Sequence, residues 1–193
     1  MLTLPRFFKN DIHKKQLLAK LKLSICPFCN RQGSLIRNGK LKGNDANAYS
    51  DQVVNRGQRI LCSKRAKNYQ GCGKSLSIWE ATYLPGLSVD ALVLSKLLLA
   101  WAEHHWVHQG WQGLSKSLSL NSAYRLWRRF GQVQSTLRQR LARISLPAHC
   151  PDITEPRHQL TKHLKNAFNG ADCPVTAFQA YFQTAFMGYT WPH

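Results

Sequence analysis

The segment Cys26-Pro27-Phe28-Cys29, followed by Cys62 and by Gly71-Cys72-Gly73, decides how the first half of this chain folds. In a Cys-x-x-Cys turn two thiolates can face one tetrahedral ion, because the intervening backbone curls its amides toward sulfur. The glycines beside Cys72 allow the tight turn that a second ligand pair needs. We therefore expect one structural zinc ion, bound by Cys26, Cys29, Cys62 and Cys72. Four thiolates leave no coordination position for a substrate.

The second cysteine pair departs from the compact spacing. Nine residues separate Cys62 from Cys72, where a compact turn would have about two. We expect the insert to bulge out as a basic loop that carries Lys64, Arg65 and Lys67. Because of this longer spacing, the sequence does not determine how the second pair would be arranged around the ion.

Two other roles for the cysteines stay open at this stage, a redox dithiol and scattered core cysteines. A redox Cys-x-x-Cys normally follows a strand in a β-α-β context, and we expect no strand before Cys26. Cys150 and Cys173 lie outside the cluster and fit the core role. Three histidines are expected to cap a helix end or to face solvent rather than bind metal: His104, His105 and His108.

The charge of the chain is strongly one-sided. It has 27 Lys and Arg against 9 Asp and Glu, a formal net charge of +18. Residues 149–193 contain three basic and three acidic residues, so residues 1–148 carry the whole excess. A basic surface gains affinity for a polyanion by releasing condensed counterions, and this favours a nucleic-acid partner over a charge that serves solubility alone.

No stretch of the chain resembles a signal peptide or a membrane span. The most apolar run, Ala91–Ala102, is interrupted by Ser95 and Lys96 and is about half the ~20 residues that a span requires. We expect no membrane partner and a cytoplasmic location, where cysteines stay reduced and available for metal.

The order of patterns predicts an α+β fold, with a small β zinc ribbon followed by an α-helical, helix-turn-helix-like domain and a helical tail. The expected regions are a basic N-terminal arm or helix at 1–24, the ribbon at 25–84, the helical domain at 85–148 and an aromatic tail at 149–193. Strands are expected over Ser34–Arg37, Gln58–Leu61 and Ser75–Trp79, with an exposed loop over Gly43–Gln52.

Helix signals dominate the second half of the chain. Ser88 is the expected N-cap of the first helix, and Asn121 or Ser122 that of the longest one. Gly110 and Gly113 indicate a turn between them. The helices that we expect are Ser88–His105, Leu114–Leu118, Ser122–Ile144, His158–Phe168 and Val175–Met187.

The longest of these helices has the two faces of a DNA recognition helix. An apolar back can pack on its own domain while an N-terminal basic front enters the major groove. Arg125 and Arg128 point away from the apolar stripe, and Arg129 flanks it. An ordinary amphipathic helix with solvated arginines is the alternative. The stripe recurs at steps of four, three, four and four residues, through Leu126, Phe130, Val133, Leu137 and Leu141.

The expected nucleic-acid contacts come from the ribbon insert and from this helical segment. Arginine can pair with guanine edges, whereas serine and lysine contact phosphates. The C-terminal half of the long helix could also form the seam of a homodimer. The candidate contacts are Lys64, Arg65, Lys67, Lys74, Lys116, Ser122, Tyr124, Arg125, Arg128 and Arg129.

Taken in order, Cys26-Pro27-Phe28-Cys29, Arg59-Ile60-Leu61-Cys62, the Gly71–Trp79 segment and the helices resemble the DNA-binding part of bacterial insertion-sequence transposases and their stand-alone relatives. The resemblance covers roughly residues 24–145. In that family the ribbon cysteines bind zinc and the following helices bind the element ends. It implies double-stranded DNA as partner and a bacterial, nucleoid-associated protein of a mobile element. The expanded second cysteine pair departs from the family's compact form.

We expect no catalysis. A DDE-type nuclease needs three carboxylates that hold two metal ions. Asp152, Glu155 and Asp172 all fall in a tail too short to build the sheet that would hold them. The expected function is therefore a non-enzymatic DNA binder, acting as a regulator or as the recognition subunit of a separate recombinase.

Three alternatives remain open: an RNA-binding zinc-ribbon protein, a small nuclease, and a structural subunit of a larger nucleoprotein assembly. The aromatic side chains of the tail could dock a recombinase or could pack on the helical domain. They include Phe178, Tyr181, Phe182, Phe186, Tyr189 and Trp191.

Overall fold

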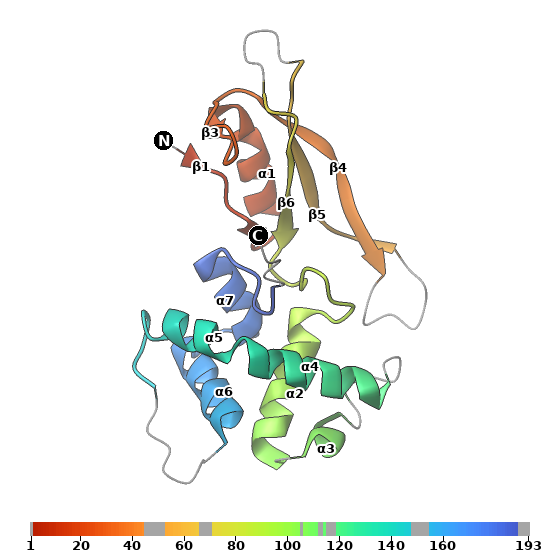
Figure 1. Ribbon diagram of the computed structural model, residues 1–193, viewed down its shortest axis with the longest axis vertical. Helices are drawn as coiled ribbons and strands as arrows, with labels where there is room; N and C mark the ends of the chain where they lie inside the picture. Colours follow the sequence, from red (N-terminus) through yellow and green to blue (C-terminus); the bar gives the residue numbers. More distant parts are fainter. Residues whose placement is uncertain are drawn as a thin grey trace. The chain divides into compact units, whose positions relative to one another are not determined.

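The computed structural model describes residues 2–44, 53–65, 71–104, 106–111, 114, 119–147 and 155–188. The chain forms two compact units, one with the described residues up to Tyr83 and the other with those from Leu84 onward. The first unit contains a four-stranded sheet, and the second is built from helices (Figure 1). The expected combination of sheet and helices is confirmed.

Strand β5 is the centre of the sheet in the first unit. The strand order is β2-β6-β5-β4, in which β5 is antiparallel to both β4 and β6, and β2 is parallel to β6. The short strands β1 and β3 form a separate parallel pair. The elements are β1 (Leu2–Thr3), β2 (Phe7–Phe8), α1 (Asp11–Ala19), the 3-10 helix η1 (Leu21–Leu23), β3 (Ser24–Ile25), β4 (Leu35–Asn44), β5 (Val53–Cys62) and β6 (Ser75–Glu80).

The core of the first unit is small and contains sulfur. Along β5 the side chains of Ile60 and Cys62 are buried, whereas Arg59 is exposed and Leu61 is only half-buried, as the two-residue period of a strand requires. Two of the six buried residues of this cluster are cysteines. The stability of this core therefore depends on whether their thiols are protonated or bound to a metal ion. Its members are Leu21, Cys26, Leu35, Ile60, Cys62 and Ile78.

The hairpin of β4 and β5 is longer than the sequence predicted. The expected loop over Gly43–Gln52 is wrong at its start, because Gly43 pairs with Val54 in the ladder. Pairing with β5 overrides the weak strand propensity of this Gly- and Lys-rich stretch. The ladder accommodates two irregularities, and Gly39 with φ +85° lies at the first of them. Residues 45–52 lie outside the described part of the chain.

The second unit packs its helices around α2. Trp101 of α2 contacts Trp127 of α4 edge-on, with ring centroids 4.6 Å apart, where α4 crosses α2 (Figure 1). The helices are α2 (Ala91–His104), α3 (Val107–Trp111), α4 (Leu120–Gln132), α5 (Gln134–Leu141), α6 (Pro156–Ala167) and α7 (Pro174–Phe182).

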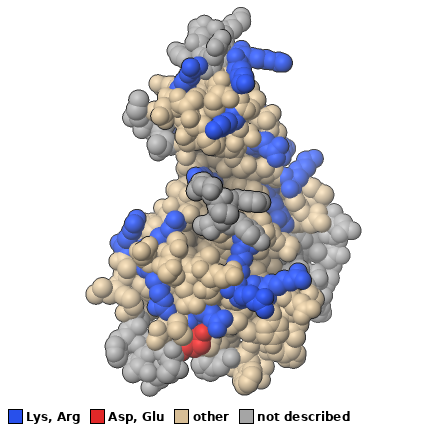
Figure 2. Space-filling view, viewed as in Figure 1, with Lys and Arg blue, Asp and Glu red and all other residues tan. Residues whose placement is uncertain are grey.

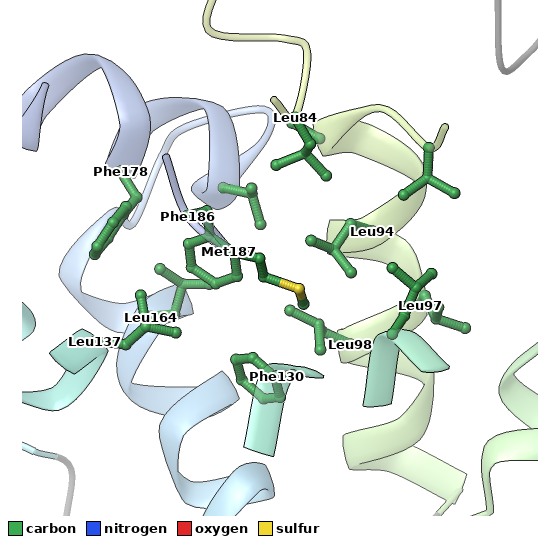
Figure 3. Packing of buried hydrophobic residues seen from close by; sticks show 14 of the residues in the cluster. Leu84, Leu94, Leu97, Leu98, Phe130, Leu137, Leu164, Phe178, Phe186 and Met187 are labelled. Atoms are coloured by element: carbon green, nitrogen blue, oxygen red, sulfur yellow. The ribbon is translucent and has the colours of Figure 1, made fainter. Parts of the chain in front are cut away.

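The described part of the C-terminal tail belongs to this helical core. Phe178 and Phe186 meet edge to face with centroids 5.1 Å apart, and Phe186 stacks on Phe130 of α4 (Figure 3). Met187 is also buried among these rings. Of the two roles considered for the tail aromatics, packing on the helices is the one observed for these residues. Tyr181 remains 63% exposed, and Tyr189 and Trp191 lie outside the described residues.

The longest expected helix is divided in two. The run expected from Ser122 to Ile144 is interrupted at Val133, which has φ −98° and ψ 3°. Gly131 and the β-branched Val133 both lower helix propensity at this point. The apolar stripe is nevertheless continuous across the break, because Phe130 and Leu137 are both buried.

Three other helix boundaries differ from expectation for local reasons. The first helix begins after Asp90, whose carboxylate accepts the amide of Val93 at 2.7 Å, so Ser88 is not the cap. Ser119 occupies the N-cap position of α4, before the expected Asn121 or Ser122. The last helix ends at Phe182 rather than Met187, because Gln183 adopts the left-handed conformation with φ 54°.

Gly110 lies inside α3 and not in the expected turn. A Cβ atom at this position would lie 2.7 Å from Cδ1 of Trp101, so the glycine permits the close approach of α3 to α2. The expected helix over Leu114–Leu118 falls largely on residues outside the described part. So does Gly113.

Replacing Phe130 by alanine should destabilise the helical unit by about 3–5 kcal/mol, because the ring is fully buried and its removal leaves a cavity. Tyr124→Ala on the same helix is the matched control, since Tyr124 is 48% exposed and should cost less than about 1 kcal/mol. Urea unfolding followed by far-UV circular dichroism measures both. Equal losses in the two variants would contradict the packing described for α4.

Candidate metal centre and nucleic-acid interface

The four predicted cysteines meet in the first unit. Their sulfur atoms all lie within 4.8 Å of one another. The Sγ atoms of Cys26 and Cys72 are 3.8 Å apart, and those of Cys29 and Cys62 are 3.7 Å apart. A tetrahedral ion with metal–sulfur bonds of about 2.3 Å requires sulfur–sulfur edges of about 3.8 Å. The thiols are free, and the arrangement fits a four-coordinate metal ion.

The first pair sits on a tight turn that follows β3. The amide of Cys26 donates to the carbonyl of Arg31 at 3.0 Å, and that of Asn30 donates to the carbonyl of Cys26 at 2.9 Å. Asn30 closes the turn in the left-handed conformation, with φ 56°. The backbone amide of Phe28 points at the Cys26 sulfur from 3.5 Å. The turn thus holds two sulfurs on one side and orients an amide toward them.

One expectation about this turn is wrong. A strand does precede Cys26, because β3 pairs in parallel with β1, and α1 lies between these two strands in the sequence. The strand is only Ser24–Ile25, too short to show as an apolar run in the sequence. The distinction from a redox dithiol therefore rests on the second cysteine pair, which brings two further sulfurs to the same point.

The second pair is compact in space despite its long spacing. The amide of Gly71 donates to the carbonyl of Ser63 at 2.8 Å, and so closes the insert at its base. The amides of Cys62 and Gly73 bond to the carbonyls of Lys74 and Cys62, both at 2.9 Å, which continues the β5–β6 ladder to the cysteines. The insert therefore leaves the ladder and returns without separating the two sulfurs.

Glycine is required at the base of this insert. A Cβ atom on Gly71 would lie 2.6 Å from the Cys62 sulfur and from the Ser63 carbonyl oxygen. Gly73 adopts φ +76°, a conformation that side chains disfavour. The amide of Cys72 is then directed at the Cys62 sulfur from 3.3 Å, and the hydroxyl of Ser34 lies 3.1 Å from it. Both groups can stabilise negative charge on that sulfur.

The two cysteines of the first turn have opposite acidities. Burial raises the pKa of the Cys26 thiol to about 12. The backbone amide of Arg31 lowers the pKa of the Cys29 thiol to about 7. A divalent cation would favour the thiolate form of every ligand and remove the cost of burying the Cys26 charge. This electrostatic setting favours metal binding over four neutral thiols.

The candidate nucleic-acid contacts of the first unit surround this cluster. Lys64 and Arg65 are exposed on the insert, and Lys67 lies outside the described residues. Lys74 is exposed as well, with its ammonium 5.3 Å from the centroid of the Phe28 ring. These residues place positive charge beside the cysteine turns.

Helix α4 carries the remaining candidates of the described chain. Tyr124, Arg125 and Arg128 are exposed on the face opposite the core. Ser122 is half-buried. Arg129 is half-buried too, and its guanidinium donates to the carbonyl oxygen of Met187, which engages it within the protein. Lys116 lies outside the described residues.

Further basic residues on β4 were not among the candidates. Arg37, Lys40 and Lys42 are exposed on this strand, which forms one edge of the sheet. No acidic residue occurs in β4 or β5. These lysines were missed because the sequence predicted a strand that ends at Arg37. Lys and Arg side chains are spread over both units on the face shown in Figure 2, and acidic side chains cover little of it.

The flank of α4 contains a cavity of about 470 Å³. Arg125, Arg128 and Gln132 lie at its exposed rim, and Val89 and Leu126 form a buried floor. The remaining lining residues are Leu87, Ser88, Ser122, Arg129, Val133 and Gly188.

Other candidates form no second site in the described part of the chain. His104 and His108 are exposed, and the four cysteines are the group there whose ligand atoms converge as a metal site requires. Glu155 caps α6, accepting the amides of Arg157 and His158 at 2.7 and 3.0 Å. Asp172 is exposed on the surface. His105, Cys150 and Asp152 lie outside the described residues.

Cys173 is partly buried against the helical core, in line with the expected core role, and it also has a local structural role. It is the N-cap of α7, where its sulfur accepts the amide of Thr176 at 3.4 Å. The seam proposed for a homodimer is occupied within the chain, because Leu137 and Leu141 are buried in the helical core.

The chain matches no protein-family model, no curated protein and no solved structure. No helix among the described residues is long and apolar enough to cross a membrane.

Replacing Cys26 or Cys72 by serine should remove the bound metal, because three sulfurs leave the site open and a hydroxyl is a poor ligand for a soft ion. Cys173→Ser is the matched control, since Cys173 lies in the other unit and serine is also a good N-cap. Elemental analysis of the purified variants measures the metal per chain. Unchanged metal content in the first two variants would rule out this site.

Acid should release the metal cooperatively. The thiols of Cys26 and Cys29, with pKa values of about 12 and about 7, are both protonated in the metal-free site below pH 7. Each competing proton weakens binding roughly tenfold per pH unit, so two or more protons predict a loss of roughly a hundredfold or more per unit below pH 7. Competition with a chelator of known proton affinity measures this slope. The slope of a single proton would contradict a site that contains both thiols.

Proposed function

We propose that this protein is a non-catalytic, zinc-dependent binder of double-stranded DNA. Its first unit would be a zinc ribbon, and α4 would act as the recognition helix of a helix-turn-helix-like unit. The observation that carries the proposal is the face of α4, where Tyr124, Arg125 and Arg128 are exposed opposite a fully buried stripe. A B-DNA major groove of about 12 Å width admits one such helix.

Zinc is the proposed ion because the donor set consists of four thiolates in a closed tetrahedral arrangement. Soft sulfur ligands favour zinc or iron over magnesium and calcium. A site without an open position serves folding and not catalysis. Four thiolates and one Zn²⁺ would add a charge of about −2, which leaves the chain strongly basic.

Binding of duplex DNA is supported by the charge of α4 and α5 as well as by their shape. Neither helix contains an acidic residue. In the described residues α3 precedes α4 and packs on it, and we propose that α3 is the preceding helix of the motif in place of Leu114–Leu118. The proposed biological role is that of a mobile-element regulator, or of the subunit that recognises DNA ends or targets for a separate recombinase.

RNA binding is the second candidate, and it draws on the exposed ring of Phe28 beside Lys74 in the first unit. Unpaired bases stack on such rings, whereas duplex DNA hides its bases. A structural role in a larger assembly would require neither surface to bind nucleic acid.

Selection from a random duplex pool, followed by fluorescence anisotropy in a salt titration, tests the proposal. Arg128→Ala and Arg125→Ala should each cost about 1–3 kcal/mol on the selected site and less on unrelated duplexes, because base-edge contacts carry the sequence preference. Lys165→Ala on α6 removes the same charge from another exposed surface and should change the affinity little.

The outcomes separate the candidates. A loss that is equal on all duplexes would reassign both arginines to phosphate contacts. Tighter binding to single-stranded RNA than to any duplex would favour the second candidate. No binding of either nucleic acid, even at low salt, would refute the proposal.

A further inference from the structure

The cavity on the flank of α4 has a charged rim and an apolar floor. Two exposed guanidiniums, those of Arg125 and Arg128, stand at the rim, and the described lining residues include no acid. Neither arginine forms an ion pair with another described residue. A concave site lined by charge of one sign concentrates counter-ions, so its ligand should be an anion.

The wall of this cavity is fixed by an internal contact. Arg129 lines the cavity and donates to the carbonyl of Met187, next to the lining residue Gly188. The bond joins α4 to the segment after α7, and residues of both segments line the cavity. Arg129 is therefore a positioning residue here, and Arg125 and Arg128 are the groups available to a ligand.

The anion should carry a phosphate. Arginine presents a planar fork of donors that pairs with two phosphate oxygens at once. The hydroxyls of Ser88 and Ser122 and the amide of Gln132 add neutral donors to the same lining. A phosphate ester can use several of these donors together.

The apolar part of the lining favours a ligand larger than inorganic phosphate. The half-buried side chains of Leu87 and Val133 would leave apolar surface facing water beside a bound ion, whereas a sugar or a base would cover it. The cavity volume of about 470 Å³ lies within the range of about 300–1,000 Å³ typical of small-molecule sites. It is too small for a segment of duplex.

We propose that this cavity binds one nucleotide, with its phosphate between Arg125 and Arg128 and its sugar or base on the apolar lining that includes Leu87 and Val133. The nucleotide has two possible sources. It is either free in solution or turned out of a DNA strand held on α4, as proteins that unstack a base achieve. The second source rests on the duplex binding proposed above, with Arg125 and Arg128 then contacting a phosphate in place of base edges, and the first source does not.

Isothermal titration of the full-length, metal-loaded protein with deoxyadenosine monophosphate tests the site. Inorganic phosphate and deoxyadenosine should each bind roughly tenfold or more weakly than the nucleotide, because each lacks one half of the interaction. A poly-glutamate peptide that competes as well as the nucleotide would overturn the assignment in favour of a carboxylate ligand.

Ser88→Trp fills the exposed mouth of the cavity and leaves every arginine in place. It should abolish nucleotide binding. Ser135→Trp, at an exposed serine of α5 outside the cavity, is the matched control and should bind as the unchanged protein does. Circular dichroism confirms that both variants fold, and equal nucleotide binding by the two would overturn the proposal.

A duplex that carries 2-aminopurine in the selected site distinguishes the two sources. A fluorescence rise on binding that is lost in Ser88→Trp would identify a nucleotide turned out of the strand. Nucleotide binding without this rise would identify a free nucleotide. Duplex binding without nucleotide binding and without the fluorescence rise would overturn the nucleotide site and leave the proposed function intact. Nucleotide binding without duplex binding would overturn the proposed function and leave the nucleotide site intact.

Discussion

The convergence of four sulfur atoms is the constraint on which the first unit depends. The cysteines join the turn after β3 to the end of β5 and the start of β6, segments that are far apart in the sequence. Cys26 and Cys62 also make up a third of the buried cluster, so the ligands are themselves core residues. A core this small gains little from apolar burial alone, and metal binding can supply folding free energy in its place.

In its described residues, the helical unit has a core of apolar and aromatic side chains in place of a sulfur cluster. Trp101, Phe130 and Phe178 are fully buried and connect α2, α4 and α7 through aromatic contacts. Because the apolar side of α4 is satisfied within this core, its opposite side is free to carry exposed arginines without a cost in packing. The core of the first unit therefore includes potential metal ligands, whereas the core of the second consists mainly of aliphatic and aromatic side chains. Both units present basic side chains with few acidic residues nearby.

The sequence predicted the features that depend on spacing and periodicity. Such patterns predicted the cysteine cluster, part of each of the strands β4, β5 and β6, and the buried stripe through Phe130 and Leu137. It could not predict features that depend on contacts between distant segments. The bond that closes the insert at Gly71, the packing of Gly110 on Trp101 and the engagement of Arg129 by Met187 each need a partner that local sequence does not reveal.

We propose that these four sulfurs bind one zinc ion without any other ligand. X-ray absorption at the zinc K-edge of the purified 193-residue protein can test this coordination. We expect one zinc ion per chain, with four sulfur neighbours at about 2.3 Å. Nitrogen or oxygen atoms in the coordination sphere, or protein that folds the first unit without any metal, would contradict it.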